Sequence, residues 1–178
     1  LTPACFAVDN TPPISSFTWP ANGRYANAIS SLTGTANADV AGPQTIEVKI
    51  TTNNITGPWW DGSAWSFNAA NSWRPAQLLS QTSWVYPGTA GDGPLGGAFS
   101  DHNRYFFYVR ATDRAGQQEV SPPVVSTDFD TTPPVLTIAR PKGPPGSPPY
   151  SNLPLDNARW LQLASGTVND VQPFASGV

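Results

Sequence analysis

The sequence predicts an all-β protein with strands arranged as a sandwich, and three observations support this prediction. Twenty Pro and fifteen Gly interrupt the chain, and only 12% of its residues are charged, which is typical of a turn-rich β protein. Residues 104–112 alternate strictly, so that Tyr105, Phe107, Val109 and Ala111 fall on one face of an extended segment. Similar short runs bounded by turn residues bring the expected number of strands to seven, as in a sandwich.

The expected strands follow one another at short intervals. In chain order they are residues 14–19, 31–36, 45–51, a hairpin at 59–65, then 83–86, 104–112 and 117–125. The turn of the hairpin is expected at Asp61-Gly62, and residues 113–116 turn the chain from the sixth run into the seventh. The predicted core consists of Phe17, Leu32, Ile46, Val48, Ile50, Trp84, Phe107, Val109 and Ala111, whereas Glu47 and Lys49 face water.

An internal repeat divides the chain. Asp9-Asn10-Thr11-Pro12-Pro13 returns as Asp130-Thr131-Thr132-Pro133-Pro134, and an apolar run that ends in Pro follows each copy. Further on, Leu32-Thr33-Gly34-Thr35-Ala36-Asn37 matches Ala164-Ser165-Gly166-Thr167-Val168-Asn169. The second match spans a longer separation than the first, so the later copy contains extra residues in a Pro-rich insertion at 141–154. We expect residues 141–149 to be an extended, exposed connector, because Pro fixes φ and lacks an amide donor.

Three pieces of the chain resemble bacterial immunoglobulin-like repeats, which occur in tandem in large secreted and cell-surface proteins. They are the Asp-x-Thr-Pro-Pro opening at residues 9–13, the Leu-Thr-Gly-Thr-Ala run at 32–36 and the Ala-Thr-Asp-Arg-Ala-Gly turn at 111–116. The chain departs from the pattern at Phe107, where relatives often have Tyr, and at Gln117, where Asn is usual. The resemblance implies a complete immunoglobulin-like β-sandwich at 9–129 after an N-terminal extension at 1–8, and the start of a second, incomplete repeat at 130–178.

The second copy contains only the first two expected strands, and a two-stranded unit is marginal in water. Its apolar residues are Val135, Leu136, Ile138, Trp160, Leu161 and Leu163. We expect these residues to pack against protein outside this copy. Either the natural chain continues, or another subunit supplies the missing strands, so the expected partners are copies of the chain or adjacent repeats in head-to-tail contact.

Composition excludes several classes of partner. The net charge of −3 disfavours nucleic-acid and anionic-membrane surfaces, which need clustered Lys and Arg. No apolar run approaches the ~18 residues of a membrane span, so we expect no direct membrane insertion. Cys5 is the only Cys, which rules out an intrachain disulfide and leaves an inert thiol or a bond to another chain.

Few residues point to chemistry. Ser100-Asp101-His102 are adjacent, whereas a catalytic triad draws its groups from separate segments, so we expect no enzymatic activity. Calcium is the one cofactor considered, with Asp9, Asp113 and Asp130 as ligand candidates, supported by Asn10 and Asp128, near the domain ends. The alternative is that these side chains cap turns, as a sandwich requires.

Two further motifs leave alternatives open. Trp59, Trp60 and Trp65 surround one hairpin and either form a sugar-stacking platform or pack against the sandwich or a neighbouring domain. Asn54-Ile55-Thr56 matches a glycosylation sequon. The expected function is that of a non-enzymatic structural or adhesive repeat of an extracellular surface protein or filament; the alternative is a carbohydrate-binding or accessory module of a secreted hydrolase.

Overall fold

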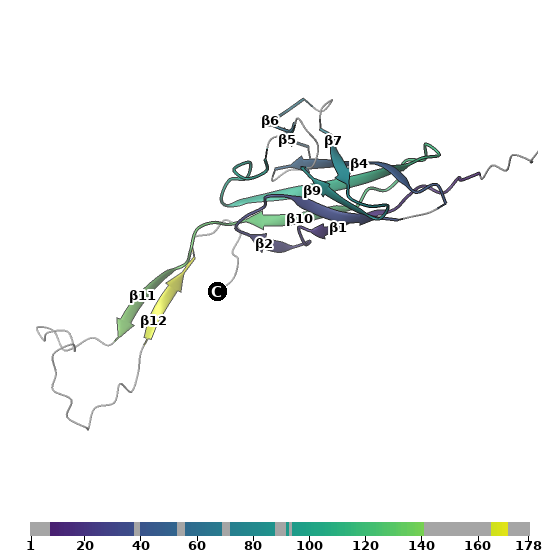
Figure 1. Cartoon of the computed structure of the whole chain (residues 1–178). Coiled ribbons are helices and arrows are strands. Elements are labelled where there is room, and N and C mark those ends of the chain that lie inside the picture. The colour runs from purple at the N-terminus through teal and green to yellow at the C-terminus, as the bar shows by residue number, and fades with distance from the viewer. Residues whose placement is uncertain are drawn as a thin grey trace, which may run out of the picture. The chain divides into compact units, whose positions relative to one another are not determined.

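The structure is a computed structural model of the whole chain, and it describes residues 8–37, 40–52, 56–68, 72–87, 92, 94–140 and 165–170 (Figure 1). The chain divides into two compact units, Leu1–Thr131 and Thr132–Val178. The described residues contain strands and no helix, which confirms the all-β prediction.

The first unit forms one curled, mixed sheet of ten strands. Their bounds are β1 (Ser15–Trp19), β2 (Arg24–Ala26), β3 (Leu32–Ala36), β4 (Pro43–Thr51), β5 (Trp59–Trp60), β6 (Trp65–Ser66), β7 (Arg74–Leu78), β8 (Ser83–Tyr86), β9 (Asn103–Asp113) and β10 (Val124–Phe129). Neighbouring strands follow the order β1-β3-β8-β7-β4-β9-β10-β2, and the short β5 pairs with β4 and β6. Most pairs are antiparallel, whereas β2 runs parallel to β10.

β7 joins the two halves of this sheet. Its Ala76 pairs with Ile46 of β4, whereas Leu78, two residues later, pairs with Trp84 of β8. The strand therefore has one half of the sheet, β1-β3-β8, on one side and the other half, β4-β9-β10-β2, on the other side. Residues from both halves meet in a single core, so the sheet curls around it.

The expected number of seven strands was too low, because β2 and β7 were missed and the hairpin at 59–65, counted once, contributes two strands, β5 and β6. β2 has three residues, too few to show an alternating pattern. β7 contains Pro75, which disfavours a strand because it cannot donate a ladder hydrogen bond. Both strands exist because neighbours that are distant in sequence pair with them.

The partner of β9 also differs from the prediction. The turn after β9 is as expected, since Asp113 N donates to Gln117 O at 3.0 Å. The expected strand at 117–125 is wrong, however: only a single bridge, Thr112 to Gln118, follows the turn, and β10 begins at Val124. Pro122 and Pro123 explain the delay, because neither has an amide hydrogen to donate. β10 consequently pairs with the N-terminal part of β9.

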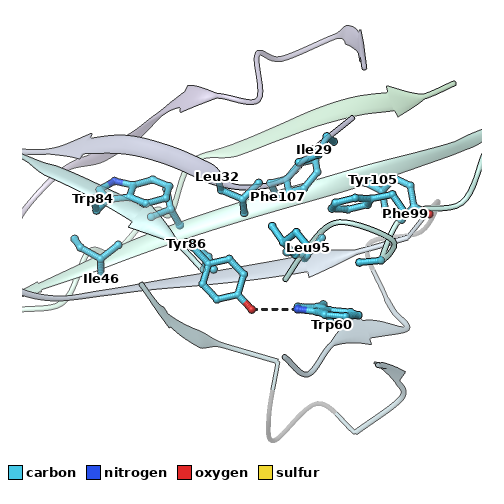
Figure 2. Close-up of a cluster of buried hydrophobic side chains, with 14 of the residues drawn as sticks. Ile29, Leu32, Ile46, Trp60, Trp84, Tyr86, Leu95, Phe99, Tyr105 and Phe107 are labelled. Carbon is cyan, nitrogen blue, oxygen red and sulfur yellow. Dashed lines mark hydrogen bonds between the residues drawn. The ribbon is translucent and has the colours of Figure 1, made fainter. Parts of the chain in front are cut away.

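The core prediction is confirmed at eight of nine positions. β9 alternates as expected, with the side chains of Tyr105, Phe107, Val109 and Ala111 all buried. Buried residues of β3, β4 and β8 complete the centre of the core: Leu32, Ile46, Val48, Ile50 and Trp84. Figure 2 shows Leu32, Ile46 and Trp84 of this set. Phe17 is half-buried and packs against this cluster from β1.

A buried carboxylate links β1 to β9. Glu119 Oε1 accepts the Ser15 amide at 3.0 Å, and Glu119 Oε2 accepts both the Ser15 hydroxyl and the Ala111 amide. Glu119 is only 9% exposed. Three hydrogen bonds satisfy a group that would otherwise be costly to bury, so this contact fixes how the two halves face each other.

The second unit contains a two-stranded antiparallel sheet of β11 (Val135–Arg140) and β12 (Ser165–Asn169), seen side by side in Figure 1. Its register repeats that of β1 and β3. β11 and β12 pair Leu136 with Val168, Thr137 with Thr167 and Ile138 with Gly166; β1 and β3 pair Ser15 with Ala36, Ser16 with Thr35 and Phe17 with Gly34. Both pairs then shift register at matching places, between Ile138 and Arg140 and between Phe17 and Trp19. The sequence repeat therefore recurs as a repeat of backbone pairing. Residues 141–149, the expected connector, lie outside the described residues.

Candidate functional site

The tryptophan hairpin of β5 and β6 is built on an Asp turn. Asp61 Oδ1 accepts the amides of Ser63 at 2.9 Å and Ala64 at 2.8 Å, and these bonds lower the pKa of the Asp61 carboxyl, the Ala64 bond most strongly. Gly62 has φ 102°, a value that side chains other than Gly rarely adopt. The turn places Trp60 opposite Trp65, as the Asp-Gly motif predicted.

The tryptophan side chains pack inward instead of offering a platform. Trp60 is 5% exposed, and its indole Nε1 donates to Tyr86 Oη at 3.1 Å (Figure 2). Trp65 Nε1 donates to the Ala98 carbonyl at 2.7 Å. The Trp65 ring packs against the ring of Tyr105, with the two centroids 5.5 Å apart. Trp59 is half-buried. These contacts favour the alternative that the sequence left open, in which the tryptophans pack against the sandwich, because stacking on a sugar needs a free ring face and Trp60 is buried in the core while Trp65 packs against it.

A polar network holds the loop after β8 against this hairpin. Tyr86 is fully buried and hydrogen-bonds to Asp92; burial, with Asp92 adding to it, raises the pKa of the Tyr86 phenol. Asp92 also forms an ion pair with Arg74, and its side chain is 2% exposed. A hollow of about 380 Å³ lies between the hairpin and residues 94–98. Trp60 and Trp65 line this hollow, but their rings also pack against other aromatic side chains.

The carboxylates proposed for calcium lie at opposite ends of the unit. Asp9 Oδ2 accepts the Ala41 amide at 2.9 Å, and Asp113 pairs with Pro43, so both lie where β4 begins and β9 ends. Asp130 follows β10, at the other end of β9. Eleven residues of β9 separate these ends by roughly 33 Å, so Asp9, Asp113 and Asp130 cannot share an ion.

Asp9 and Asp113 instead cap turns. Asp9 Oδ1 accepts the Thr11 amide at 3.0 Å, and Asp113 Oδ1 accepts the Gln117 amide at 2.8 Å. Of the supporting residues, Asp128 forms a bidentate ion pair with Arg104. These contacts favour the alternative that the sequence left open, in which Asp side chains stabilise turns.

Asp130 does lie beside two other ligand-type groups. Oxygen or nitrogen atoms of Asp101, His102 and Asp130 all lie within 4.8 Å of one another. His102 has φ 59°, and its Nε2 is 3.5 Å from Asp101 Oδ2. Such a set of ligands could hold a cation. Asp101 Oδ1, however, accepts the amides of His102 and Thr131, which is also the geometry of a turn cap. Sequence reasoning considered His102 only for catalysis and missed its proximity to Asp130, because residues 102 and 130 meet only through β9 and β10.

The outer face of β4 and β9 contains a cluster of cations and aromatic rings that the sequence analysis did not single out. The Lys49 ammonium lies 4.9 Å from the centroid of the Trp73 ring and 4.7 Å from that of Tyr108. The Arg110 guanidinium lies 4.2 Å from the centroid of the Trp73 ring, and Arg110 Nε donates to Glu47 Oε2 at 2.7 Å. Burial, and then the charge of Arg110, lowers the pKa of Lys49. Trp73 directly precedes β7, the strand that was not expected.

The assembly residues fall in the second unit. Val135 and Leu136 are 59% and 65% exposed, and Val168, which the prediction omitted, is 43% exposed. Ile138 lies in β11. Trp160, Leu161 and Leu163 lie outside the described residues, as do Asn54 and Cys5.

Comparison with known proteins places this chain in no family. No protein-family model matches it, and no curated protein matches it. One similar solved structure is the crystal structure of an engineered protein, with a TM-score of 0.39 and 16% identity over 66% of this chain and 20% of that chain. This chain thus spans 20% of the length of that protein, and a likeness at this level supports no argument. Among the described residues, no helix has the length and apolar content that crossing a bilayer requires.

Proposed function

We propose that the chain is a non-enzymatic structural repeat of an extracellular surface protein or filament, with an immunoglobulin-like sandwich as its first unit and the start of another as its second. Consecutive repeats contact each other head to tail. The residues that resemble immunoglobulin-like repeats support the family, and two halves of a curled sheet around one core are compatible with a sandwich.

The repeated register of β1-β3 and β11-β12 is the observation that supports this proposal most directly. Two stretches that are far apart in the chain pair residue for residue in the same way, including the shift after Phe17 and after Ile138. An enzyme does not need such duplication, whereas a repeat protein is built from it.

The second unit also has an apolar face that needs a partner. Leu136 and Val168 pair across β11 and β12, at the positions of Ser15 and Ala36, which are both buried in the first unit. Full burial of each such aliphatic side chain is worth about 1.5–3 kcal/mol. A contact between this face and a different surface of the next unit is heterologous, so it propagates along a filament or tandem array unless it closes a ring.

The self-association of the chain tests the proposal. We expect concentration-dependent oligomers in analytical ultracentrifugation, and we expect Leu136→Glu to remove them because it buries an unpaired charge in the contact. Thr137→Glu is the matched control, since successive residues of a strand face opposite sides and Thr137 stands at the position of exposed Ser16.

A monodisperse monomer at high concentration whose residues 132–178 resist protease would contradict the proposal, because it would show that the second unit needs no partner. For the carbohydrate-binding alternative, the measurement is glycan titration followed by Trp fluorescence. A saturable shift that is lost in Trp59→Ala would support that alternative instead.

A further inference from the structure

Gly34 forms the floor of a slot that a tryptophan ring fills. Gly34 pairs directly with Trp84 of β8, and a Cβ added to Gly34 would lie 2.3 Å from Trp84 Cζ2. Trp84 is 1% exposed, and its Nε1 donates to the Thr35 carbonyl at 3.1 Å. Its ring meets that of Phe17 edge-on, with centroids 5.4 Å apart. The slot therefore combines a missing side chain, a carbonyl acceptor and an apolar neighbour.

The second unit has the same slot positions. Gly166 stands where Gly34 does, Thr167 where Thr35 does, and Ile138 pairs with Gly166 as Phe17 pairs with Gly34. β3 has a strand on each side, β1 and β8. Among the described residues of the second unit, β12 pairs with β11 in a sheet of two strands. In the first unit, β8 pairs with the side of β3 that faces away from β1. A further strand could pair in the same way with the side of β12 that faces away from β11.

We propose that the side of β12 that faces away from β11 binds an antiparallel β-strand with a tryptophan opposite Gly166. The ring lies flat over the glycine, and its indole N–H donates to the Thr167 carbonyl. Among large side chains only tryptophan combines a wide apolar face with a ring N–H donor at its edge. The backbone of the added strand supplies affinity, and the tryptophan supplies register and specificity.

At one position the second unit must be covered by a different side chain from the one that covers the first unit. Ser15 donates its amide and hydroxyl to Glu119, whereas the matching residue of β11 is Leu136, which has no hydroxyl and is 65% exposed. The bound strand therefore belongs to a partner that meets Leu136 with an apolar group, because a carboxylate there would lose a hydrogen-bond donor. This inference rests on the proposed function and adds the chemistry of the contact.

The test uses the full chain and a labelled peptide with the sequence of residues 79–87, which contains β8 and Trp84. We expect saturable binding by fluorescence anisotropy, with competition by the unlabelled peptide. The same peptide with Trp84→Ala should bind roughly thirtyfold more weakly, as expected when a central tryptophan is truncated.

Gly166→Val in the full chain closes the slot and should weaken binding of the Trp84 peptide to a similar extent. Valine favours strands, so this change leaves β12 able to form. Thr137→Val, on the opposite face of the same sheet, is the control and should bind as the unchanged chain does. Amide hydrogen exchange in β12 should slow when the peptide binds, and should not slow in Gly166→Val.

Three results would overturn the inference: no binding of the peptide, equal binding of the Trp84→Ala peptide, or equal binding by Gly166→Val. If the chain still forms oligomers that Leu136→Glu removes, the proposed function stands and only the tryptophan slot is wrong. If the chain is also a monomer with a protected second unit, the proposed function is wrong as well.

Discussion

Gly34→Ala should destabilise the first unit strongly, although it adds a single methyl group. The added carbon would lie 2.0 Å from the Ser16 carbonyl oxygen and 2.3 Å from the Trp84 ring, and real Cβ contacts are not this short. Either β1 must separate from β3, or Trp84 must leave its place. Displacing Trp84 costs its hydrogen bond to Thr35, about 0.5–1.5 kcal/mol, and overpacking costs about 1–3 kcal/mol. With the lost edge contact to Phe17, worth about 0.5–1.5 kcal/mol, these contributions add to a total of about 2–6 kcal/mol.

Urea and thermal unfolding, followed by circular dichroism, measure this loss. For a unit of this size the melting temperature should fall by roughly 10–20 °C. Gly96→Ala is the control, because nothing lies within 4 Å of its added carbon, and it should change stability by less than about 0.5 kcal/mol. Trp84→Ala combined with Gly34→Ala should cost less than the two changes separately, since the ring is then gone. If Gly34→Ala is as mild as Gly96→Ala, the Trp84 ring does not pack tightly over Gly34, and Gly34 does not form a slot for it.

Four further predictions concern the core and its polar contacts. Val109→Asp should unfold the first unit, since Val109 is fully buried; an unchanged melting temperature would refute the register of β9. Tyr86→Phe should cost about 1–3 kcal/mol in urea unfolding, because the buried Trp60 indole loses its acceptor, and a neutral result would show that another acceptor replaces it. Burial raises the pKa of Tyr86 and of Tyr105 above 10.0, so the folded state keeps protons that the unfolded chain releases, and stability should fall as pH rises above about 10. Urea unfolding at several alkaline pH values, with tyrosinate absorbance, checks this sign; stability that rises there would contradict it. Glu47→Gln should cost at most about 1 kcal/mol, because its ion pair is partly exposed, and a larger loss would mean that the cation–aromatic cluster depends on that charge.

The faces of the long strands were predictable because alternation is a local property. In β9, Phe107 and Val109 lie two residues apart and therefore face the same side, whatever the strand pairs with. The repeat was visible for a similar reason, since matching residues such as Gly34 and Gly166 recur in matching runs. What those glycines are for was not visible, because the ring over Gly34 comes from β8, about fifty residues away in the sequence.

The sequence by itself determined the all-β class, the inward faces of β4 and β9, the turn at Asp113 and the repeat. Each of these depends on residue types at short, regular spacing. Only the tertiary structure decided the pairings of β2 and β7, the inward packing of Trp60 and the separation of Asp9 from Asp130 by the length of β9. These features depend on which distant segments meet, and a strand of three residues or a carboxylate in a turn has no local pattern that specifies its neighbour.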